Sequence, residues 1–350
     1  MLEPIAPDRQ TPSVDGGGKR ARRRSPDFGR ASPSLRQPTP GVFLILIVAA
    51  VSPRLPRGMC FDPVHQIAMV TNNAEDVPFS TFISAATKTI LGKISFTTAS
   101  NGAERCQWNP RTGLFYIAIP EISGPGNNSA PGGVAVIDPT TLQVITTFTV
   151  PIASCSGPQG LAIGPAPQIL LGCNGGKNMP PNRPTAVIND GSTGGVAGSV
   201  FATLNFQAGA DMVDYNPASN HYTLARSNNN PVNQQVPATC PVPPGTAGPQ
   251  VIGVVDAVDQ SSDPDVVSGI FNCPTSPHGG NHSIASDPVT NQTYFPVAST
   301  SGATLCGSNG GDNSQGCIVV FTDPQVSQCV AQGAPVVEVS GVLMTAPCPQ

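Results

Sequence analysis

Residues 133–150 read Gly-Val-Ala-Val-Ile-Asp-Pro-Thr-Thr-Leu-Gln-Val-Ile-Thr-Thr-Phe-Thr-Val. Two runs of apolar and β-branched residues flank a short turn, which is the pattern of a β-hairpin. A related pattern, in which a β-prone run ends in Asp, Asn or Gly before a proline and a second β-prone run follows, occurs five times in the chain. The prolines that mark these copies are Pro63, Pro110, Pro165, Pro217 and Pro288, at intervals of 47, 55, 52 and 71 residues.

A second hairpin follows each copy, so each unit is predicted to contain four short strands. These second hairpins lie at residues 82–96, 133–150, 186–204, 251–271 and 317–322. Four strands that recur about every fifty residues are typical of β-propeller blades. A β-sandwich is the alternative, but sandwich strands do not recur as four-strand cassettes. The longest interval contains a Pro/Asn-rich insertion, residues 228–250, which we interpret as a loop within a propeller domain that spans residues 56–350.

Closure of the ring is the difficulty with this fold. Five blades are visible, whereas propellers of this blade type usually have six or seven. Our hypothesis is that the unmatched head, residues 1–55, replaces the first one or two blades of a longer ancestor and leaves the ring incomplete at its N-terminal side. Such a ring would expose sheet edges. Residues 335–346 are predicted to form a further strand that covers one of them.

Composition excludes helical folds and disfavours nucleic acid as a partner. The chain has 37 Gly and 39 Pro in 350 residues, and only 11% of its residues are charged, against roughly 25% in an average domain. Helical bundles and coiled coils need far more charged surface than this, so the fold is predicted to be all-β. Residues 1–60 contain 10 of the 17 Lys and Arg but 4 of the 21 acidic residues, so the remainder is acidic. An acidic body with one Trp lacks the basic, aromatic face that binds nucleic acid.

The basic head is predicted to be disordered, since residues 1–40 are rich in Pro, Ser, Gly and Arg. The apolar run 41–51 is too short to span a bilayer but fits the hydrophobic region of a secretory signal. We therefore expect no stable membrane span and an extracytoplasmic location, secreted or periplasmic. Two alternatives stay open for the apolar run, namely a buried strand of the folded domain and an unselected extension from a misassigned start codon.

Cysteine usage points to the same compartment. None of the ten cysteines forms a Cys-x-x-Cys pair or lies near a histidine at zinc-ligand spacing, so disulfides in an oxidising compartment are the better explanation. Their positions in the repeats predict the pairs Cys155–Cys173, Cys240–Cys273 and Cys306–Cys317, because each pair flanks one hairpin or inserted loop. Free buried thiols are the alternative.

With these repeats the chain resembles the YVTN/NHL-type superfamily of extracytoplasmic propellers over residues 57–340, and residues 133–150 resemble their outer hairpin. A narrower resemblance to gluconolactonase-type propeller lactonases lies at the starts of the innermost strands. The segment Glu104-Arg105-Cys106-Gln107-Trp108-Asn109 is similar to their Glu-x-x-x-Trp-Asp motif, and Pro158-Gln159-Gly160-Leu161-Ala162 to their Pro-Asn-Gly-Leu-Ala motif. Residues 211–214 and Asn281 align with their remaining ligand positions. The resemblance implies a divalent-metal site with the ligands Glu104, Gln159, Asp211 and Asn281.

The residues themselves support an oxygen-rich ring independently of that resemblance. Side chains at the starts of innermost strands project into the mouth of the channel, where these four would suit a hard cation such as calcium or magnesium. The metal would polarise a lactone carbonyl and activate water, with Glu104 or Asp211 assisting proton transfer. The alternative is that these polar groups cap turns and hydrate the channel.

His278 and His282 flank the segment Gly279-Gly280-Asn281, where a histidine pair could act as acid and base or bind a metal or haem group. His282 is the stronger candidate because it lies beside the proposed ring, whereas a histidine in a surface loop is the plainer interpretation. Taken together, the sequence predicts a secreted or periplasmic propeller that binds a small molecule or a protein at its axial face. The alternatives are a metal-dependent lactonase that uses Glu104, Asp211 and His282, and a structural envelope protein.

Overall fold

The computed structural model describes residues 58–73, 75–173, 184–204, 209–226, 250–257, 270–272, 282–297, 317–322, 336–339 and 342–345. The described residues form strands and turns and contain no helix, which confirms the all-β prediction. The predicted head, the insertion 228–250 apart from its last residue, and the cysteines Cys240, Cys273 and Cys306 lie outside the described residues.

Four antiparallel sheets of four strands each follow the predicted repeat. The strands of the first two sheets are β1 (Gly58–Asp62), β2 (Ile67–Asn72), β3 (Phe79–Ser84), β4 (Ile90–Ser95), β5 (Cys106–Asn109), β6 (Leu114–Ile119), β7 (Gly132–Asp138) and β8 (Gln143–Val150). Those of the third and fourth are β9 (Pro158–Ile163), β10 (Gln168–Cys173), β11 (Thr185–Asn189), β12 (Val200–Leu204), β13 (Ala210–Asn216), β14 (His221–Arg226), β15 (Gln250–Asp256) and β16 (Ile270–Asn272). In each sheet, consecutive strands are neighbours.

A fifth sheet begins in the same way and ends differently. Its strands are β17 (Ala285–Asp287), β18 (Gln292–Val297), β19 (Cys317–Thr322), β20 (Val336–Val339) and β21 (Val342–Thr345), in the order β17-β18-β19-β21-β20. The predicted strand at 335–346 is therefore a hairpin, and its second strand β21 pairs with β19 in parallel. Whether a complete ring has six or seven blades stays a prediction, because the chain before residue 58 is outside the described residues.

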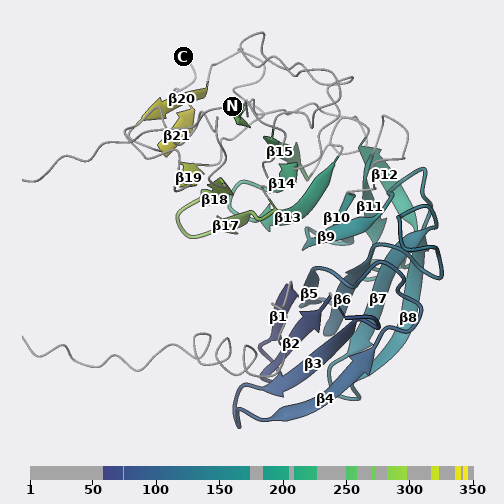
Figure 1. The fold of residues 1–350 in the computed structure, drawn as a ribbon. Helices are drawn as coiled ribbons and strands as arrows, with labels where there is room; N and C mark the ends of the chain where they lie inside the picture. The colour runs from purple at the N-terminus through teal and green to yellow at the C-terminus, as the bar shows by residue number, and fades with distance from the viewer. Residues whose placement is uncertain are drawn as a thin grey trace, which may run out of the picture. The chain divides into compact units, whose positions relative to one another are not determined.

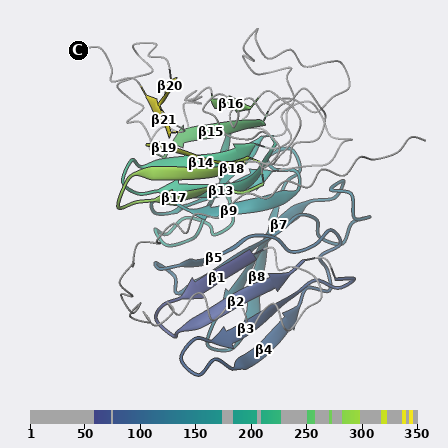
Figure 2. The ribbon, with the colours of Figure 1, turned by 60° about the vertical axis from the view of Figure 1, so that its left-hand side comes forward.

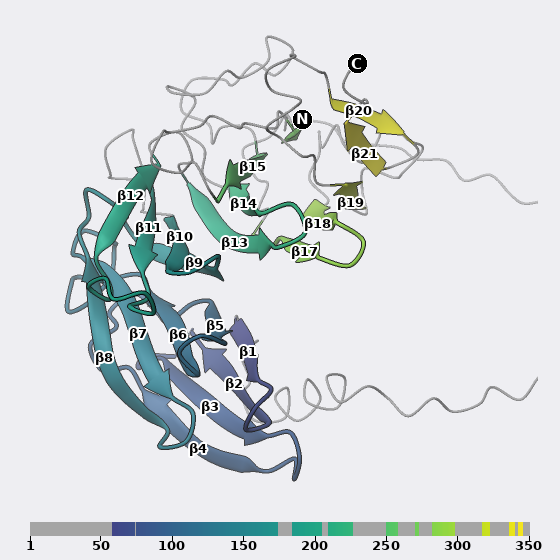
Figure 3. The same cartoon turned by 180° about the vertical axis from the view of Figure 1, so that it is seen from behind.

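The sheets are arranged as propeller blades. The first strands of successive sheets contact one another, from β1 to β5, β5 to β9, β9 to β13 and β13 to β17. These first strands lie on the inside of the arrangement and β4, β8 and β12 on the outside, as seen from the front and from behind (Figure 1, Figure 3). Turned by 60°, the sheets are seen stacked on one another (Figure 2). Packing of four-stranded sheets face to face around their first strands is the arrangement that the repeat predicted.

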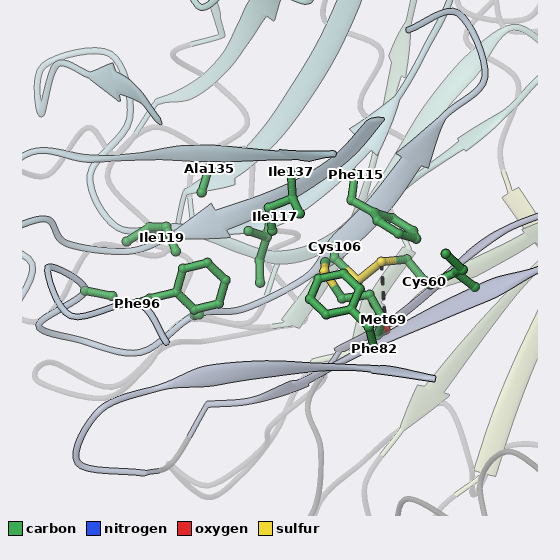
Figure 4. Packing of buried hydrophobic residues seen from close by; sticks show 13 residues of the cluster. Cys60, Met69, Phe82, Phe96, Cys106, Phe115, Ile117, Ile119, Ala135 and Ile137 are labelled. Atoms are coloured by element: carbon green, nitrogen blue, oxygen red, sulfur yellow. Dashed lines mark hydrogen bonds between the residues drawn. A yellow bond between two sulfur atoms is a disulfide. The ribbon is translucent and has the colours of Figure 1, made fainter. Parts of the chain in front are cut away.

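The hydrophobic core lies between neighbouring sheets rather than within one of them. Between the first and second sheets, Met69 and Phe82 pack against Phe115 and Ile117 (Figure 4). The alternate residue Tyr116 faces the other way and packs with the third sheet. Side chains of a strand alternate between its two faces, so a middle strand that is covered on both faces buries consecutive residues. This explains the continuous apolar runs within β2, β6 and β10, whereas β14 and β18 carry polar residues among their apolar ones.

The recurring proline follows an Asp or Asn in four of the five repeats, and the side chain of that residue accepts a hydrogen bond within the turn between the first and second strands. The carboxylate or amide oxygen before each of four such prolines accepts the backbone N–H two residues further on, as in Val64 N to Asp62 Oδ1 at 2.8 Å. The same bond recurs at Asn109, Asn216 and Asp287. Asp or Asn supplies this acceptor and proline presets the backbone angle of the turn, which explains why the pair recurs at the same place in the chain's own repeats.

These turns also link neighbouring blades. Asn109 Nδ2 donates to Asp190 Oδ2 at 2.8 Å, and Arg111 Nη2 lies 2.7 Å from the same oxygen. Burial alone would raise the pKa of Asp190, but hydrogen bonds from Ser192, Asn109 and Arg111 hold that pKa below its ordinary value. The ionised carboxylate therefore ties the second blade to the third.

Replacing Asp190 by asparagine is expected to lower the free energy of unfolding by about 1–3 kcal/mol at pH 7, because Arg111 loses its charged partner. A carboxyl whose folded pKa is depressed stabilises the fold above its unfolded pKa and loses that contribution as the pH falls through the folded pKa. The difference between the two proteins should therefore shrink below about pH 4. Urea unfolding at pH 7 and pH 3 measures both values, and a difference that is equal at the two would contradict the ionic role.

Two disulfides are described. Cys155–Cys173 confirms the prediction for the third blade, and Cys60–Cys106 joins the first strands of the first and second blades. These four cysteines are the ones whose side chains the structure describes, and all four are disulfide-bonded. The predicted pairs Cys240–Cys273 and Cys306–Cys317 each involve a residue outside the described ranges and stay predictions.

Candidate functional site

All candidate site residues that the structure describes lie at one edge of the blades. At this edge, which we call the axial edge, the first strands begin and the second strands end, so that Gly58 pairs with Thr71 and Cys106 with Ile117. The loops 73–78, 96–105 and 120–131 lie there too, because each joins strands that start or end at that edge. Glu104, Gln159, Asp211 and His282 lie at or just before the starts of β5, β9, β13 and β17, and their roles stay predictions.

Glu104 precedes β5 and is held by the first blade. Its side chain is buried, and Asn73 Nδ2, just past β2, donates to Glu104 Oε1 at 2.6 Å. The backbone N–H of Glu104 donates to Ala118 O at 2.9 Å, which extends the pairing of β5 with β6 by two residues. Gly58, at the start of β1, allows the backbone of Glu104 to lie close to the first blade, since a Cβ at position 58 would lie only 2.8 Å from Glu104 O. Glu104 is thus a fixed acceptor at the boundary of two blades.

Arg105, the next residue, reaches across the third blade to the fourth. Its backbone N–H donates to Gln159 O at 3.2 Å, and its Nη2 lies 3.2 Å from Asp214 Oδ1. The second oxygen, Asp214 Oδ2, accepts the backbone N–H of Ser286 in β17 at 2.7 Å. The Arg105–Asp214 pair therefore connects the second, third, fourth and fifth blades at the axial edge.

Burial sets the electrostatics of this pair. Both side chains are 17% exposed. Burial lowers the pKa of Arg105, and Asp214 acts in the opposite direction. Burial likewise raises the pKa of Asp214, against the effect of Arg105 and of the hydrogen bond from Ser286. Each charge is therefore costly to bury alone and depends on the other.

Asp211 and His282 are brought together from two blades. Asp211 lies near the start of β13, where the register with β14 shifts between Ala210 and Val213. Such a bulge re-aims the side chains within it. Asp211 Oδ2 contacts His282 Nδ1, and the His282 side chain is 59% exposed whereas that of Asp211 is 11% exposed. A carboxylate in contact with Nδ1 fixes the orientation of the imidazole ring.

These positions do not test the predicted oxygen ring. Gln159 lies in β9 between Arg105 and β13, and Asn281 and His278 lie outside the described residues. Among the residues described, no group of three or more His, Cys, Asp or Glu side chains is placed to hold a metal ion. Glu104 contacts Asn73 and Asp211 contacts His282. The metal ligands Glu104, Gln159, Asp211 and Asn281 therefore stay a prediction.

Two residues of this edge, Arg105 and Asp214, had no role predicted from the sequence. Arg105 lies in the quoted segment 104–109, and Asp214 lies in the aligned segment 211–214. Basic residues are scarce after residue 60, and Arg105 is one of the few. Its presence next to a candidate carboxylate indicates that it could pair with another carboxylate. The sequence could not identify that partner, because it lies two blades away.

Charge at the axial edge is predominantly acidic. The described loops contribute Glu75, Asp76, Glu104 and Glu121, while Arg105 in the same loops is paired with Asp214. Arg226, at the end of β14, is fully buried, and burial lowers its pKa to about 9. Among the described residues of this edge, a ligand would meet Glu75, Asp76 and the His282 imidazole, whereas the side chains of Arg105 and Arg226 are largely or fully buried.

No family model and no curated protein matches the chain. Among solved structures, hydrazine synthase of Kuenenia stuttgartiensis is similar at 14% identity and a TM-score of 0.42, over 69% of this chain and 74% of that one. A nidogen/laminin complex is similar at 9% identity and a TM-score of 0.42, over 70% and 73%. At these identities the resemblance says nothing of activity.

In the part of the chain that the structure describes, no helix is long and apolar enough to cross a membrane.

Proposed function

We propose that this protein is an extracytoplasmic binding propeller whose axial edge takes a small, positively charged ligand. The observation that carries the proposal is the Asp211–His282 pair, in which two blades meet and leave an imidazole exposed. Asp211 orients the ring, and the exposed His282 imidazole is the group that contacts the ammonium or similar group of the ligand. The carboxylates of the described loops at this edge attract a cation and repel an anion.

The disulfides support the proposed location. Cys60–Cys106 and Cys155–Cys173 are buried cross-links of a kind that persists in oxidising compartments. The metal-dependent lactonase stays an untested alternative, and the structural envelope role would require that the axial edge bind nothing.

The proposal is tested by calorimetric titration of the purified chain with trilysine, a short peptide that presents several ammonium groups. We expect Asp211→Asn and His282→Gln each to weaken binding by about tenfold or more, which corresponds to about 1.4 kcal/mol. Asp138→Asn is the matched control, because it removes the same charge from the β7–β8 turn at the opposite edge. Equal weakening by Asp138→Asn would show diffuse attraction to an acidic protein and would overturn the proposed site.

The same titration with calcium distinguishes the metal-dependent alternative. Saturable calcium binding that is lost in both Glu104→Gln and Asp211→Asn would favour the predicted ring over the Asp211–His282 acceptor. Turnover of a lactone panel by the calcium-loaded protein would then be the further requirement for an enzyme.

A further inference from the structure

The loop 120–131, between β6 and β7, encloses a carboxylate that the proposed function does not use. Glu121 is fully buried. Its Oε1 accepts the backbone N–H of Ala130 at 2.8 Å, while Oε2 is buried without a hydrogen-bond partner. Among the described residues, no lysine, arginine or histidine forms an ion pair with it. One of its two oxygens is therefore desolvated and uncompensated.

The walls of this loop are fixed by backbone hydrogen bonds to the preceding connection, residues 96–105. Ser123 N donates to Thr98 O at 2.7 Å and Ser100 N to Glu121 O at 3.1 Å. Gly124 N donates to Ser100 Oγ at 3.0 Å. The two ends of the loop are joined by a hydrogen bond in which Ile122 N donates to Pro131 O at 2.9 Å. The carboxylate thus lies in a built enclosure.

The enclosure fits closely around Glu121. A Cβ on Gly124 would overlap with Glu121 Oε1 and would lie 2.5 Å from Ala130 Cβ, so only glycine allows the chain to pass there. Gly126 passes close to a carbonyl in the same way, since a Cβ on it would lie 2.9 Å from Ser100 O. Asn128, buried with a positive φ, accepts a hydrogen bond from Asn101 Nδ2 at 2.6 Å. Ser100 O and Asn128 Oδ1 therefore lie where the loop 120–131 meets residues 96–105.

An isolated carboxylate is costly to bury unless a cation or a full set of donors compensates it. The loop and residues 98–101 also carry backbone carbonyl and side-chain oxygens, which are ligands that calcium takes together with a carboxylate. We propose that Glu121 Oε2 is the charged ligand of a calcium site in loop 120–131, completed by oxygens of this loop and of residues 98–101 and by water. This site is structural, is separate from the Asp211–His282 pair, and does not depend on the proposed function.

The test is thermal unfolding of the full chain after treatment with EGTA, with and without added calcium chloride. We expect calcium at a hundredfold excess over its dissociation constant to raise the melting temperature of the wild-type protein by about 5 °C, with magnesium chloride giving a smaller rise. Glu121→Gln, which keeps the size and removes the charge, should abolish the rise. Glu121→Asp, which keeps the charge on a shorter side chain, should retain a reduced rise.

Two controls separate this site from the axial one. Asp211→Asn should keep the full calcium-dependent rise, and Glu121→Gln should still bind trilysine. The proposal is overturned if calcium leaves the wild-type melting temperature unchanged, or if Glu121→Gln and the wild-type protein respond equally. If Glu121→Gln does not fold, Glu121→Asp takes its place. A calcium-dependent rise in its melting temperature that is smaller than that of the wild-type protein supports the site, and a rise equal to that of the wild-type protein overturns it.

Discussion

Replacing Arg105 by methionine is expected to lower the free energy of unfolding by about 2–4 kcal/mol at pH 7, which is among the largest effects of any single side chain in this protein. The change leaves Asp214 ionised and largely buried with no opposite charge beside it. Because the pair joins the second blade to the fourth and Asp214 also accepts from the fifth, the loss falls on the contacts of the axial edge. Urea unfolding followed by circular dichroism measures it.

The pH dependence of this variant has a definite sign. Burial already raises the pKa of Asp214, and loss of Arg105 should raise that pKa further. A carboxyl whose folded pKa is raised destabilises the fold above that pKa and ceases to do so as it becomes protonated. The deficit of Arg105→Met should therefore be largest at neutral pH and should shrink as the pH falls through the raised pKa.

The double variant Arg105→Met, Asp214→Leu isolates the ion pair from the rest of the site. Apolar replacement of both partners removes the unpaired charge, so its loss should be smaller than the sum of the two single losses. Lys88→Met, at an exposed turn, is the control and should cost less than about 0.5 kcal/mol. Strict additivity of the two single losses would contradict a direct Arg105–Asp214 interaction.

Replacing both Cys60 and Cys106 by alanine is expected to lower the free energy of unfolding by about 4 kcal/mol through the entropy of the unfolded chain. The disulfide closes a loop between residues 46 apart in the sequence, and both cysteines are buried beside Phe82 and Phe115 (Figure 4). It also joins the first two blades by a covalent bond at their innermost strands. Its loss should therefore loosen the first blade before the others.

The second disulfide provides an internal comparison. Cys155 and Cys173 are 18 residues apart, so the same entropy argument predicts a smaller loss of about 3 kcal/mol for their replacement. Denaturant unfolding of both double variants, with proteolysis to locate early opening, measures the difference. A native protein whose Cys60 and Cys106 react with a thiol reagent without reduction would contradict the first disulfide outright.

The repeat was predictable from sequence because its signals are local. A proline after Asp or Asn marks a turn that the side chain itself closes, and a middle strand with both faces buried, such as β6, reads as a continuous apolar run. The Cys155–Cys173 pair was predictable for the same reason, since it flanks one hairpin. Cys60–Cys106 was not, because its two ends belong to different blades and become neighbours only when the first strands pack side by side.

In the candidate site too, single residues could be predicted from local sequence, whereas contacts between blades could not. Glu104, Asp211 and His282 were identified singly from their positions at strand starts. The contact between Asp211 and His282, and the reach of Arg105 to Asp214, depend on how successive blades are placed, which no local pattern encodes. The burial of Glu121 depends on a loop whose shape is set by hydrogen bonds to a different connection.

The most direct test of the binding proposal is nitrogen NMR of the four histidines during a titration with trilysine. We predict that His282 is the neutral tautomer with a proton on Nδ1, and that its Nε2 resonance shifts saturably with the peptide. The shift should disappear in Asp211→Asn. An Nε2 resonance of His282 that stays unchanged while the peptide binds elsewhere would contradict the proposed binding site.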